Sequence, residues 1–162
     1  AGGMRFGDVV ELKWEHLPGW PGEEAEVRYK MGKNDNVTGL PISDGLREIL
    51  QHFDHRREEG KERVFPIMEG RSTSTPEERE VAKRSANAAV NRCLQRIASE
   101  LDISHLSFHM SRNLAAKVWY ETFGDIKETS EVLGHNSVQQ TEQYLSAFGG
   151  IEIDDEKVDE VF

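Results

Sequence analysis

The stretch of sequence that decides the fold is HLSFHMSRNLAAKVWYETFGDIKETSEVLGHNSVQQTEQY, residues 105–144. Two glycines, Gly124 and Gly134, divide it, and a glycine commonly follows the last residue of a helix. Apolar residues recur at helical spacing on either side of these glycines. We therefore predict a helix that ends at Gly124, a short helix over residues 126–133 that ends before Gly134, and a further helix over residues 138–148.

Four polar side chains of this stretch have the chemistry of a reactive site. His109 and Arg112 are three residues apart, so both lie on one face of their helix. A Leu-Gly-His turn ends in His135, and Tyr144 follows that histidine by nine residues. A tyrosine on an amphipathic helix is most often a packed residue, so each feature alone is weak evidence. Their significance depends on what the rest of the chain supplies.

The N-terminal segment supplies two further cations. Apolar residues after Gly3 predict a short helix that starts near Met4 and places Arg5 at its N-terminus, where an arginine and unpaired backbone N–H groups can face a phosphate. Two β-prone runs, residues 25–31 and 37–42, then flank Lys-Asn-Asp-Asn, which suits a hairpin tip. We predict a β-hairpin with Lys33 at its tip.

The middle of the chain predicts two more helices. Ser43 is a natural N-cap for a helix that Gly60 stops. Thr75 and Glu78 form a capping box, with proline between them, for a long helix that runs to about residue 101. Small and apolar residues make one stripe along it, and Cys93 within that stripe is predicted to be a core residue. Basic residues on the opposite side could contact a DNA backbone, or they could equally form a solvated face: Arg79, Lys83, Arg84, Arg92 and Arg96.

These elements predict an α+β fold that is mainly α: a helical domain with a small antiparallel β-sheet. The chain has 162 residues, which suits one domain over residues 1–150 followed by an acidic tail at 151–162. A single cysteine excludes an internal disulfide and indicates a reducing compartment. No apolar run is long enough to span a membrane, so we expect no membrane partner and a cytoplasmic location.

Charge argues against strong DNA binding by this chain alone. The formal net charge is −10, from 20 basic and 30 acidic residues. DNA-binding domains usually carry a basic excess. Residues 151–162 hold six acids and one lysine and contribute −5 of the total. We expect low DNA affinity that depends strongly on salt.

We predict no metal site. His52 and His55 have no third ligand type nearby in the sequence. His105 and His109 are four apart, but Leu106 stands where the His-Glu-x-x-His zinc motif needs its glutamate.

Taken in order, the candidate residues resemble the signature of tyrosine recombinases, the phage integrase family. The set comprises Arg5, Lys33, His109, Arg112, His135 and Tyr144. Gly-Met-Arg-x-x-Asp-x-x-x-Leu at residues 3–12 resembles the family's Gly-Leu-Arg-x-x-Glu-x-x-x-Leu box, with Asp8 in place of glutamate. In the family a lysine on such a hairpin enters the active site, and Lys33 follows a glycine and precedes Pro41 by eight residues, as in the family; Lys30 is the alternative candidate. The chain departs from the family's His-x-Leu-Arg-His-Thr at Ser111 and Asn113.

This resemblance implies the catalytic domain of a DNA breaking-rejoining enzyme. Tyr144 would attack the scissile phosphate and form a 3′-phosphotyrosyl link, and Arg5 and Arg112 would stabilise the phosphate oxygens. Lys33 would protonate the departing 5′ oxygen, and His109 would be the general base. His135 would donate a hydrogen bond to a phosphate oxygen, and no metal or cofactor is required.

The resemblance also implies partners and a larger protein. Double-stranded DNA would be the substrate, bound by a homotetramer, whereas the isolated chain would be a monomer. The family has more catalytic domain upstream of Arg5, and before that a core-binding domain that closes a clamp around DNA. We therefore expect the N-terminal part to be truncated and the fragment to recombine poorly. A mobile genetic element is the expected source, and the tail at 151–162 could dock on a neighbouring protomer.

Two rival functions stay open from sequence alone. A type IB topoisomerase uses a similar arginine, lysine and tyrosine set to relax DNA without strand exchange. The acidic charge also suits a non-catalytic integrase fold that was retained for DNA binding or regulation.

Overall fold

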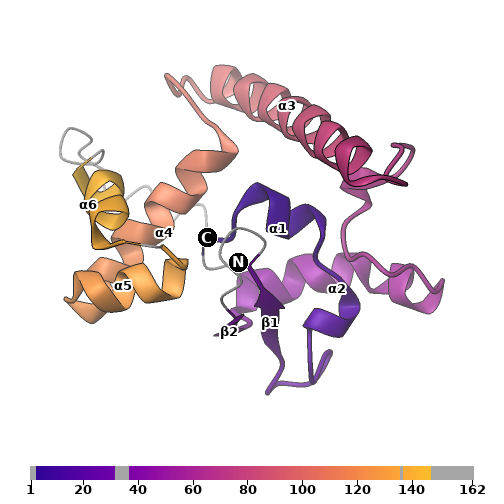
Figure 1. Cartoon of the computed structure of the whole chain (residues 1–162), viewed down its shortest axis with the longest axis horizontal. Coiled ribbons are helices and arrows are strands. Elements are labelled where there is room, and N and C mark those ends of the chain that lie inside the picture. The colour runs from indigo at the N-terminus through magenta and orange to yellow at the C-terminus, as the bar shows by residue number, and fades with distance from the viewer. Residues whose placement is uncertain (1–2, 32–36, 136, 147–162) are drawn as a thin grey trace.

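The structure is a computed structural model that describes residues 3–31, 37–135 and 137–146. Six helices, two strands and two 3₁₀ turns follow one another along these residues (Figure 1). Their order is α1 (Phe6–Val10), η1 (Trp14–His16), β1 (Glu26–Lys30), β2 (Val37–Pro41), α2 (Asp44–Glu58), η2 (Pro66–Met68), α3 (Pro76–Glu100), α4 (Phe108–Phe123), α5 (Ile126–Leu133) and α6 (Val138–Ser146). The predicted class, mainly α with a small antiparallel sheet, is confirmed.

The N-terminal part packs the β-hairpin against α2. Strands β1 and β2 pair antiparallel in the register Val27↔Leu40, as the hairpin prediction requires. Alternate β1 residues Val27 and Tyr29 point into a core that also receives Leu50 from α2. Ser43 caps α2 as predicted, because its hydroxyl accepts a hydrogen bond from the Leu46 N–H.

The long helix α3 begins with the predicted capping box, in which Thr75 and Glu78 exchange hydrogen bonds. Ala82 and Ala86 on its first half are buried against a second apolar cluster that includes Val10 and Met68. The prediction that Cys93 is a core residue is wrong, since its side chain is exposed. Helical periodicity identifies a candidate apolar face, but it does not tell whether another element covers that face.

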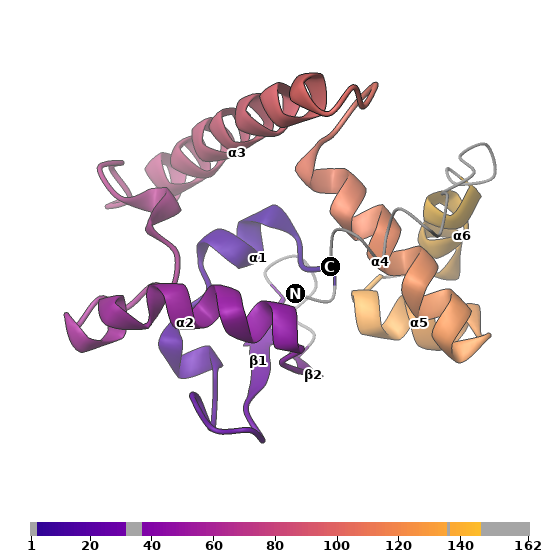
Figure 2. The same ribbon diagram turned by 180° about the vertical axis from the view of Figure 1, so that it is seen from behind.

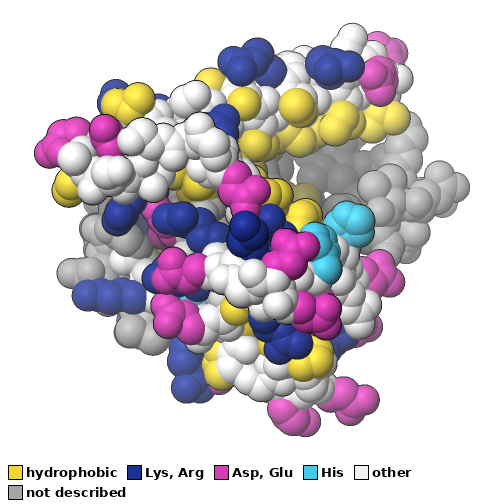
Figure 3. Space-filling model, turned by 90° about the vertical axis from the view of Figure 1, so that its right-hand side faces the viewer, with side chains coloured by type: hydrophobic (Ala, Val, Ile, Leu, Met, Phe, Trp, Pro, Cys, Tyr) yellow, Lys and Arg dark blue, Asp and Glu magenta, His cyan; other side chains and the backbone are white. Residues whose placement is uncertain are grey.

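The basic flank of α3 is partly engaged in ion pairs. Arg79 and Lys83 lie 3.9 and 3.6 Å from the carboxylate of Glu11. Arg84, Arg92 and Arg96 are exposed. Figure 3 shows lysine and arginine side chains on the outer side of the uppermost helix and apolar side chains along its inner side.

The C-terminal part is a compact group of three helices, α4, α5 and α6, which pack on one another (Figures 1 and 2). Gly124 and Gly134 end α4 and α5 in the left-handed conformation, with φ of 66° and 62°, as predicted. Asp125 caps α5, because its carboxylate accepts hydrogen bonds from two backbone N–H groups of the first turn. In the described residues, no helix is long and apolar enough to cross a membrane.

Candidate active site

Two arginines connect the N-terminal segment to the end of α5. Arg5 stands at the N-cap of α1, and its Nη2 donates to the carbonyl of Gly134 at 2.9 Å. Arg112 on α4 donates from Nη2 to the carbonyl of Leu133 at 2.6 Å and from Nη1 to the carbonyl of Gly3. The last carbonyls of a helix lack intrahelical partners and carry partial negative charge, so they suit cationic donors.

Keeping both Arg5 and Arg112 positively charged costs free energy. Arg112 is 4 % exposed. Burial lowers the pKa of Arg112, and the positive charge of Arg5 lowers it further, while the Tyr144 hydroxyl partly offsets both effects. Carbonyl dipoles orient the two guanidiniums without cancelling their charge. An anion placed between them would relieve the repulsion, and a planar guanidinium suits a phosphate because it can bind two oxygens.

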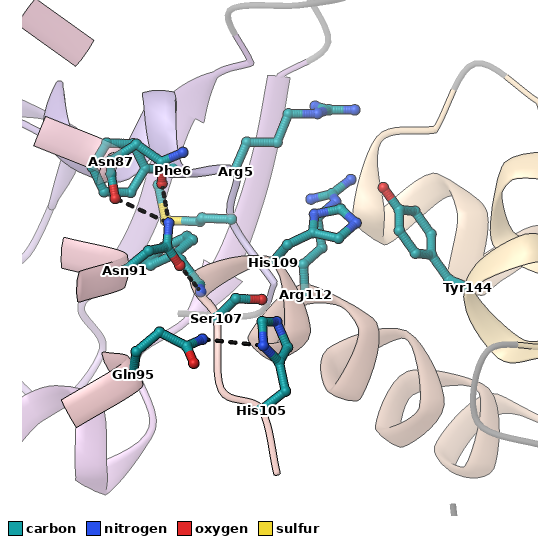
Figure 4. A pocket seen from close by; sticks show the side chains of 12 residues that line it. Arg5, Phe6, Asn87, Asn91, Gln95, His105, Ser107, His109, Arg112 and Tyr144 are labelled. Carbon is teal, nitrogen blue, oxygen red and sulfur yellow. Dashed lines mark hydrogen bonds between the residues drawn. The ribbon is translucent and has the colours of Figure 1, made fainter. Parts of the chain in front are cut away.

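Tyr144 reaches the same place from α6 and lies beside two histidines. Its ring is stacked on His135, with centroids 4.8 Å apart and an interplanar angle of 25°. The His109 ring lies 5.3 Å away at 52°. Arg112 Cζ is 6.0 Å from the centre of the tyrosine ring. In Figure 4 the hydroxyl of Tyr144 points toward Arg112 and His109.

The two histidines have different surroundings. His109 is exposed on α4. His135 is 9 % exposed, and its Nδ1 lies 2.8 Å from the hydroxyl oxygen of Thr141, which is fully buried in α6. This hydrogen bond fixes the orientation of the His135 ring against Tyr144. His109 can therefore turn more freely toward a ligand than His135 can.

A cavity of about 500 Å³ opens in front of these side chains. Arg5, His109, Arg112 and Tyr144 line one side, and Figure 3 shows histidine side chains beside a hollow under the uppermost helix. The opposite wall comes from one face of α3 and from the loop before α4, namely Asn87, Asn91, Gln95 and His105 (Figure 4). Among the described residues, no three His, Cys, Asp or Glu side chains form a group that could hold a metal ion.

The structure brings five of the six candidate residues together. Arg5, His109, Arg112 and Tyr144 line the cavity, and His135 stacks on the tyrosine. Lys33 lies outside the described residues, so its position stays a prediction. The alternative Lys30 is exposed at the end of β1. The chemical role of each residue also stays a prediction.

Sequence reasoning missed the groups that hold the site in place. Gly3, Leu133 and Gly134 act through their carbonyls, which any residue carries, so their identities gave no signal. Thr141 is three residues before the tyrosine on the same helix and looked like an ordinary polar position. The amides of α3 left a usable sign, since Asn87, Asn91 and Gln95 recur every four residues and therefore form one stripe.

Several named recombinases are similar to this chain. It is 27 % identical over 146 residues to tyrosine recombinase XerC of Pseudomonas aeruginosa, covering 89 % of this chain and 43 % of the relative. XerC of Roseiflexus castenholzii is 29 % identical over 145 residues, with 89 % and 43 % covered. The chain thus spans less than half the length of the curated relatives that it matches.

Solved structures show the same fold. The XerH site-specific recombinase, bound to its difH substrate in a pre-cleavage complex, matches with a TM-score of 0.64 and 20 % identity over 99 % of this chain and 42 % of that one. XerA recombinase matches with a TM-score of 0.63 and 17 % identity, covering 99 % and 52 %. The sequence model of the phage integrase family matches residues 1–148 of this chain. Because that match spans nearly the whole chain, the chain belongs to the phage integrase family.

Proposed function

We propose that this chain is the catalytic part of a site-specific recombinase that cuts and rejoins double-stranded DNA through a 3′-phosphotyrosyl link. One observation carries the proposal: Tyr144 contacts Arg112 and two imidazoles, and it lines one cavity together with a second arginine. These groups come from α1, α4, the turn after α5 and α6. A packed structural tyrosine would not need two buried or half-buried cations beside it.

The proposed first step is a transesterification at phosphorus. The Tyr144 hydroxyl oxygen bonds to the scissile phosphorus and gives its proton to His109 as the bond to the 5′ oxygen breaks. The 5′ oxygen takes a proton from Lys33 and leaves as a hydroxyl. Arg5 and Arg112 bind the nonbridging oxygens, whose charge grows in the transition state. His135 donates a hydrogen bond to a phosphate oxygen.

The second step reverses the first with a different strand. A 5′ hydroxyl of the partner strand attacks the phosphotyrosyl phosphorus and releases Tyr144, which recovers a proton. The number of phosphoester bonds does not change, so the reaction needs no external energy source. Neither step needs a metal or an organic cofactor.

The named relatives support this proposal and the expected partners. XerH binds the difH substrate, and a lambda integrase fragment with 18 % identity and a TM-score of 0.51 is a dimer bound to a core site. We propose by analogy that the whole protein binds DNA as a homotetramer in the cytoplasm and that it recombines the DNA of a mobile genetic element. Docking of the tail at 151–162 on a neighbouring protomer is part of the same proposal and concerns residues outside the described ranges.

Covalent capture tests the reaction. The full-length protein that contains this chain is incubated with nicked duplexes whose sequence around the nick is randomised. After cleavage, the short fragment that carries the new 5′ hydroxyl ends at the nick and dissociates, so that the strand cannot be rejoined. Denaturing gels should reveal a protein–DNA adduct with the wild-type protein and none with Tyr144→Phe. An adduct that persists in the phenylalanine variant would overturn the assignment of the nucleophile.

The rival functions predict different outcomes of the same preparation. Efficient relaxation of a supercoiled plasmid, without exchange of strands between duplexes, would indicate a topoisomerase. Tight binding to particular duplexes of the randomised set, without any protein–DNA adduct, would indicate a non-catalytic DNA-binding domain.

A sulfur substitution tests the general acid. When the 5′ bridging oxygen of the substrate is replaced by sulfur, the leaving group is a thiolate, which departs without a proton because thiols are far more acidic than alcohols. Lys33→Ala should therefore cleave the oxygen substrate at least about 100-fold more slowly than wild type and the sulfur substrate at nearly the wild-type rate. The matched variant Lys30→Ala should cleave both substrates normally. The reverse pattern would assign the acid to Lys30.

A further inference from the structure

The helix that carries His109 and Arg112 is capped from outside. Helix α4 begins at Phe108, and Ser107 at its N-cap makes no side-chain capping bond. The first four N–H groups of a helix lack partners within that helix. The Phe108 N–H donates instead to Oδ1 of Asn91, at 2.8 Å, and Asn91 belongs to α3. A side chain from another helix thus does what an N-cap residue usually does.

Asn91 is held in the orientation that this cap requires. Its Nδ2 donates to the side-chain oxygen of Asn87 at 2.9 Å and to the Asn87 carbonyl at 3.0 Å. A backbone N–H can only donate and a carbonyl can only accept, so these neighbours define which end of the amide is oxygen. The oxygen of Asn91 therefore faces α4, and three hydrogen bonds keep it there.

Two further contacts join the same region of α3 and α1 to the start of α4. One helical turn after Asn91, Nε2 of Gln95 donates to the Leu106 carbonyl at 2.6 Å and lies 3.1 Å from Nδ1 of His105. Phe108 also meets Phe6 edge to face, with ring centroids 5.1 Å apart. Phe6 follows Arg5 directly, so Phe108 connects the segments that carry the two arginines. Figure 4 shows the amides of α3 on one side of the cavity and the His109 helix on the other.

We propose that Asn91 is a positioning residue for the reaction at Tyr144. It fixes the first residue of α4, and His109 is the next residue, with Arg112 one turn further on. A start of α4 that frays or shifts would move His109 relative to the Tyr144 hydroxyl, whereas the carbonyl bonds of Arg112 would still hold the deeper part of the helix. This inference rests on the function proposed above, because it assigns the helix start a role in that reaction.

Three variants separate the cap from other roles of the side chain. Asn91→Leu keeps the size of the side chain and removes the acceptor. Asn91→Asp keeps the acceptor and adds a charge that favours a helix N-terminus, but it loses the two hydrogen bonds that Nδ2 donates to Asn87. Asn87→Ala removes one hydrogen bond that orients Asn91 and leaves the Phe108 bond in place. The protein is the full-length form, and the DNA is a nicked duplex recovered in the randomised capture.

The rate of adduct formation is measured in single turnover at saturating DNA, so that repulsion between the new aspartate and phosphate affects binding but not the rate. We expect Asn91→Leu to react about tenfold more slowly, with a DNA dissociation constant within about twofold of wild type. Asn91→Asp should recover part of the rate, and Asn87→Ala should lie between wild type and Asn91→Leu, because it weakens the orientation of Asn91 without removing the cap. A purely structural role would reduce the fraction of active protein rather than the rate of the active fraction.

Hydrogen exchange of the Phe108 N–H adds a readout that does not depend on activity. Exchange should be at least about tenfold faster in Asn91→Leu than in wild type and in Asn91→Asp. Wild-type rate and wild-type exchange in the leucine variant would overturn this inference and leave the proposed function intact. A wild-type protein that forms no adduct would overturn the proposed function, and the inference with it.

Discussion

Replacing Gly3 by alanine should damage both the stability of the domain and the arginine pair. Gly3 has φ of +81°, a region that costs a residue with a side chain about 1–2 kcal/mol. A Cβ at this position would lie 2.8 Å from the Cβ of Ala115 and 2.9 Å from Cδ2 of Leu133. Forcing an extra methyl group into packed surroundings costs about 1–3 kcal/mol more. The sum is about 2–5 kcal/mol of lost unfolding free energy.

A shift of the backbone at residue 3 would also disturb the position of Arg112 in the candidate active site. The carbonyl of Gly3 accepts the hydrogen bond from Nη1 of Arg112, so a backbone that retreats from Ala115 withdraws this anchor. At about 2–4 °C per kcal/mol for a domain of this size, calorimetry should find the melting temperature lowered by about 4–20 °C. The rate of adduct formation, measured below the melting transition, should fall at least about tenfold.

Gly7→Ala is the matched control, because Gly7 lies within α1 and a Cβ there would meet nothing within 4 Å. Alanine is the better helix former, so this variant should be about 0.5–1 kcal/mol more stable than wild type. Equal stability of the two alanine variants, with an unchanged adduct rate in Gly3→Ala, would refute the steric argument and the role of the Gly3 carbonyl.

Three other predictions follow from single contacts. Thr141→Val leaves the buried Nδ1 of His135 without its hydroxyl, which should cost about 1–3 kcal/mol in urea unfolding and slow adduct formation, whereas Thr141→Ser should resemble wild type. Burial, with the charge of Asp8, raises the pKa of Tyr29 from its ordinary value of 10.0 to about 12. The protonated hydroxyl therefore contributes its full share of the folding stability below pH 10, and this share is lost as the pH rises through 12. Stability should therefore fall by up to about 1.4 kcal/mol per pH unit in that window, and equal slopes for wild type and Tyr29→Phe would contradict this. Arg112→Lys cannot hold both carbonyls and a phosphate, so adduct formation should fall about 100-fold or more while DNA binding changes little; a near-normal rate would contradict the bidentate role.

The parts of the fold that the sequence predicts are those set by local chemistry. Thr75 and Glu78 meet across a single helical turn, and Gly134 ends a helix because it adopts φ of 62° readily. Such signals need no knowledge of distant residues. Cys93 shows where this fails: its stripe has the spacing of a buried face, yet burial depends on which elements pack over that part of α3.

The site divides in the same way. The spacing of His109 and Arg112 places them on one helix face, and the resemblance to a family supplies the order of the six candidates. What holds Arg112 is a pair of carbonyls from the N-terminal segment and from the end of α5, 109 and 21 residues away in sequence. Contacts of this kind arise only when the chain has folded, because every residue offers a carbonyl. The cap on α4 is another long-range contact: the stripe of amides on α3 is visible in the sequence, but its partner, the Phe108 N–H, is not.

The net charge of the chain and the charge at its site act over different distances. The net charge of −10 lowers affinity for DNA, and interactions between exposed charges are largely screened beyond about 8–10 Å at physiological salt. Inside the cavity, carbonyl dipoles hold Arg5 and Arg112 and leave both positive charges in place. A phosphodiester carries one negative charge, and the pentacovalent state of the proposed reaction carries about two.

The arginine pair therefore gains more from the transition state than from bound DNA, which is the condition for an interaction to speed a reaction. Burial and the repulsion from Arg5, which lower the pKa of Arg112, are costs already present before DNA binds. Those costs are relieved most when the charge around phosphorus is greatest. An acidic surface and a catalytic site for phosphoryl transfer are thus compatible in one chain, because the first sets how tightly DNA is held and the second sets how fast the bound phosphate reacts.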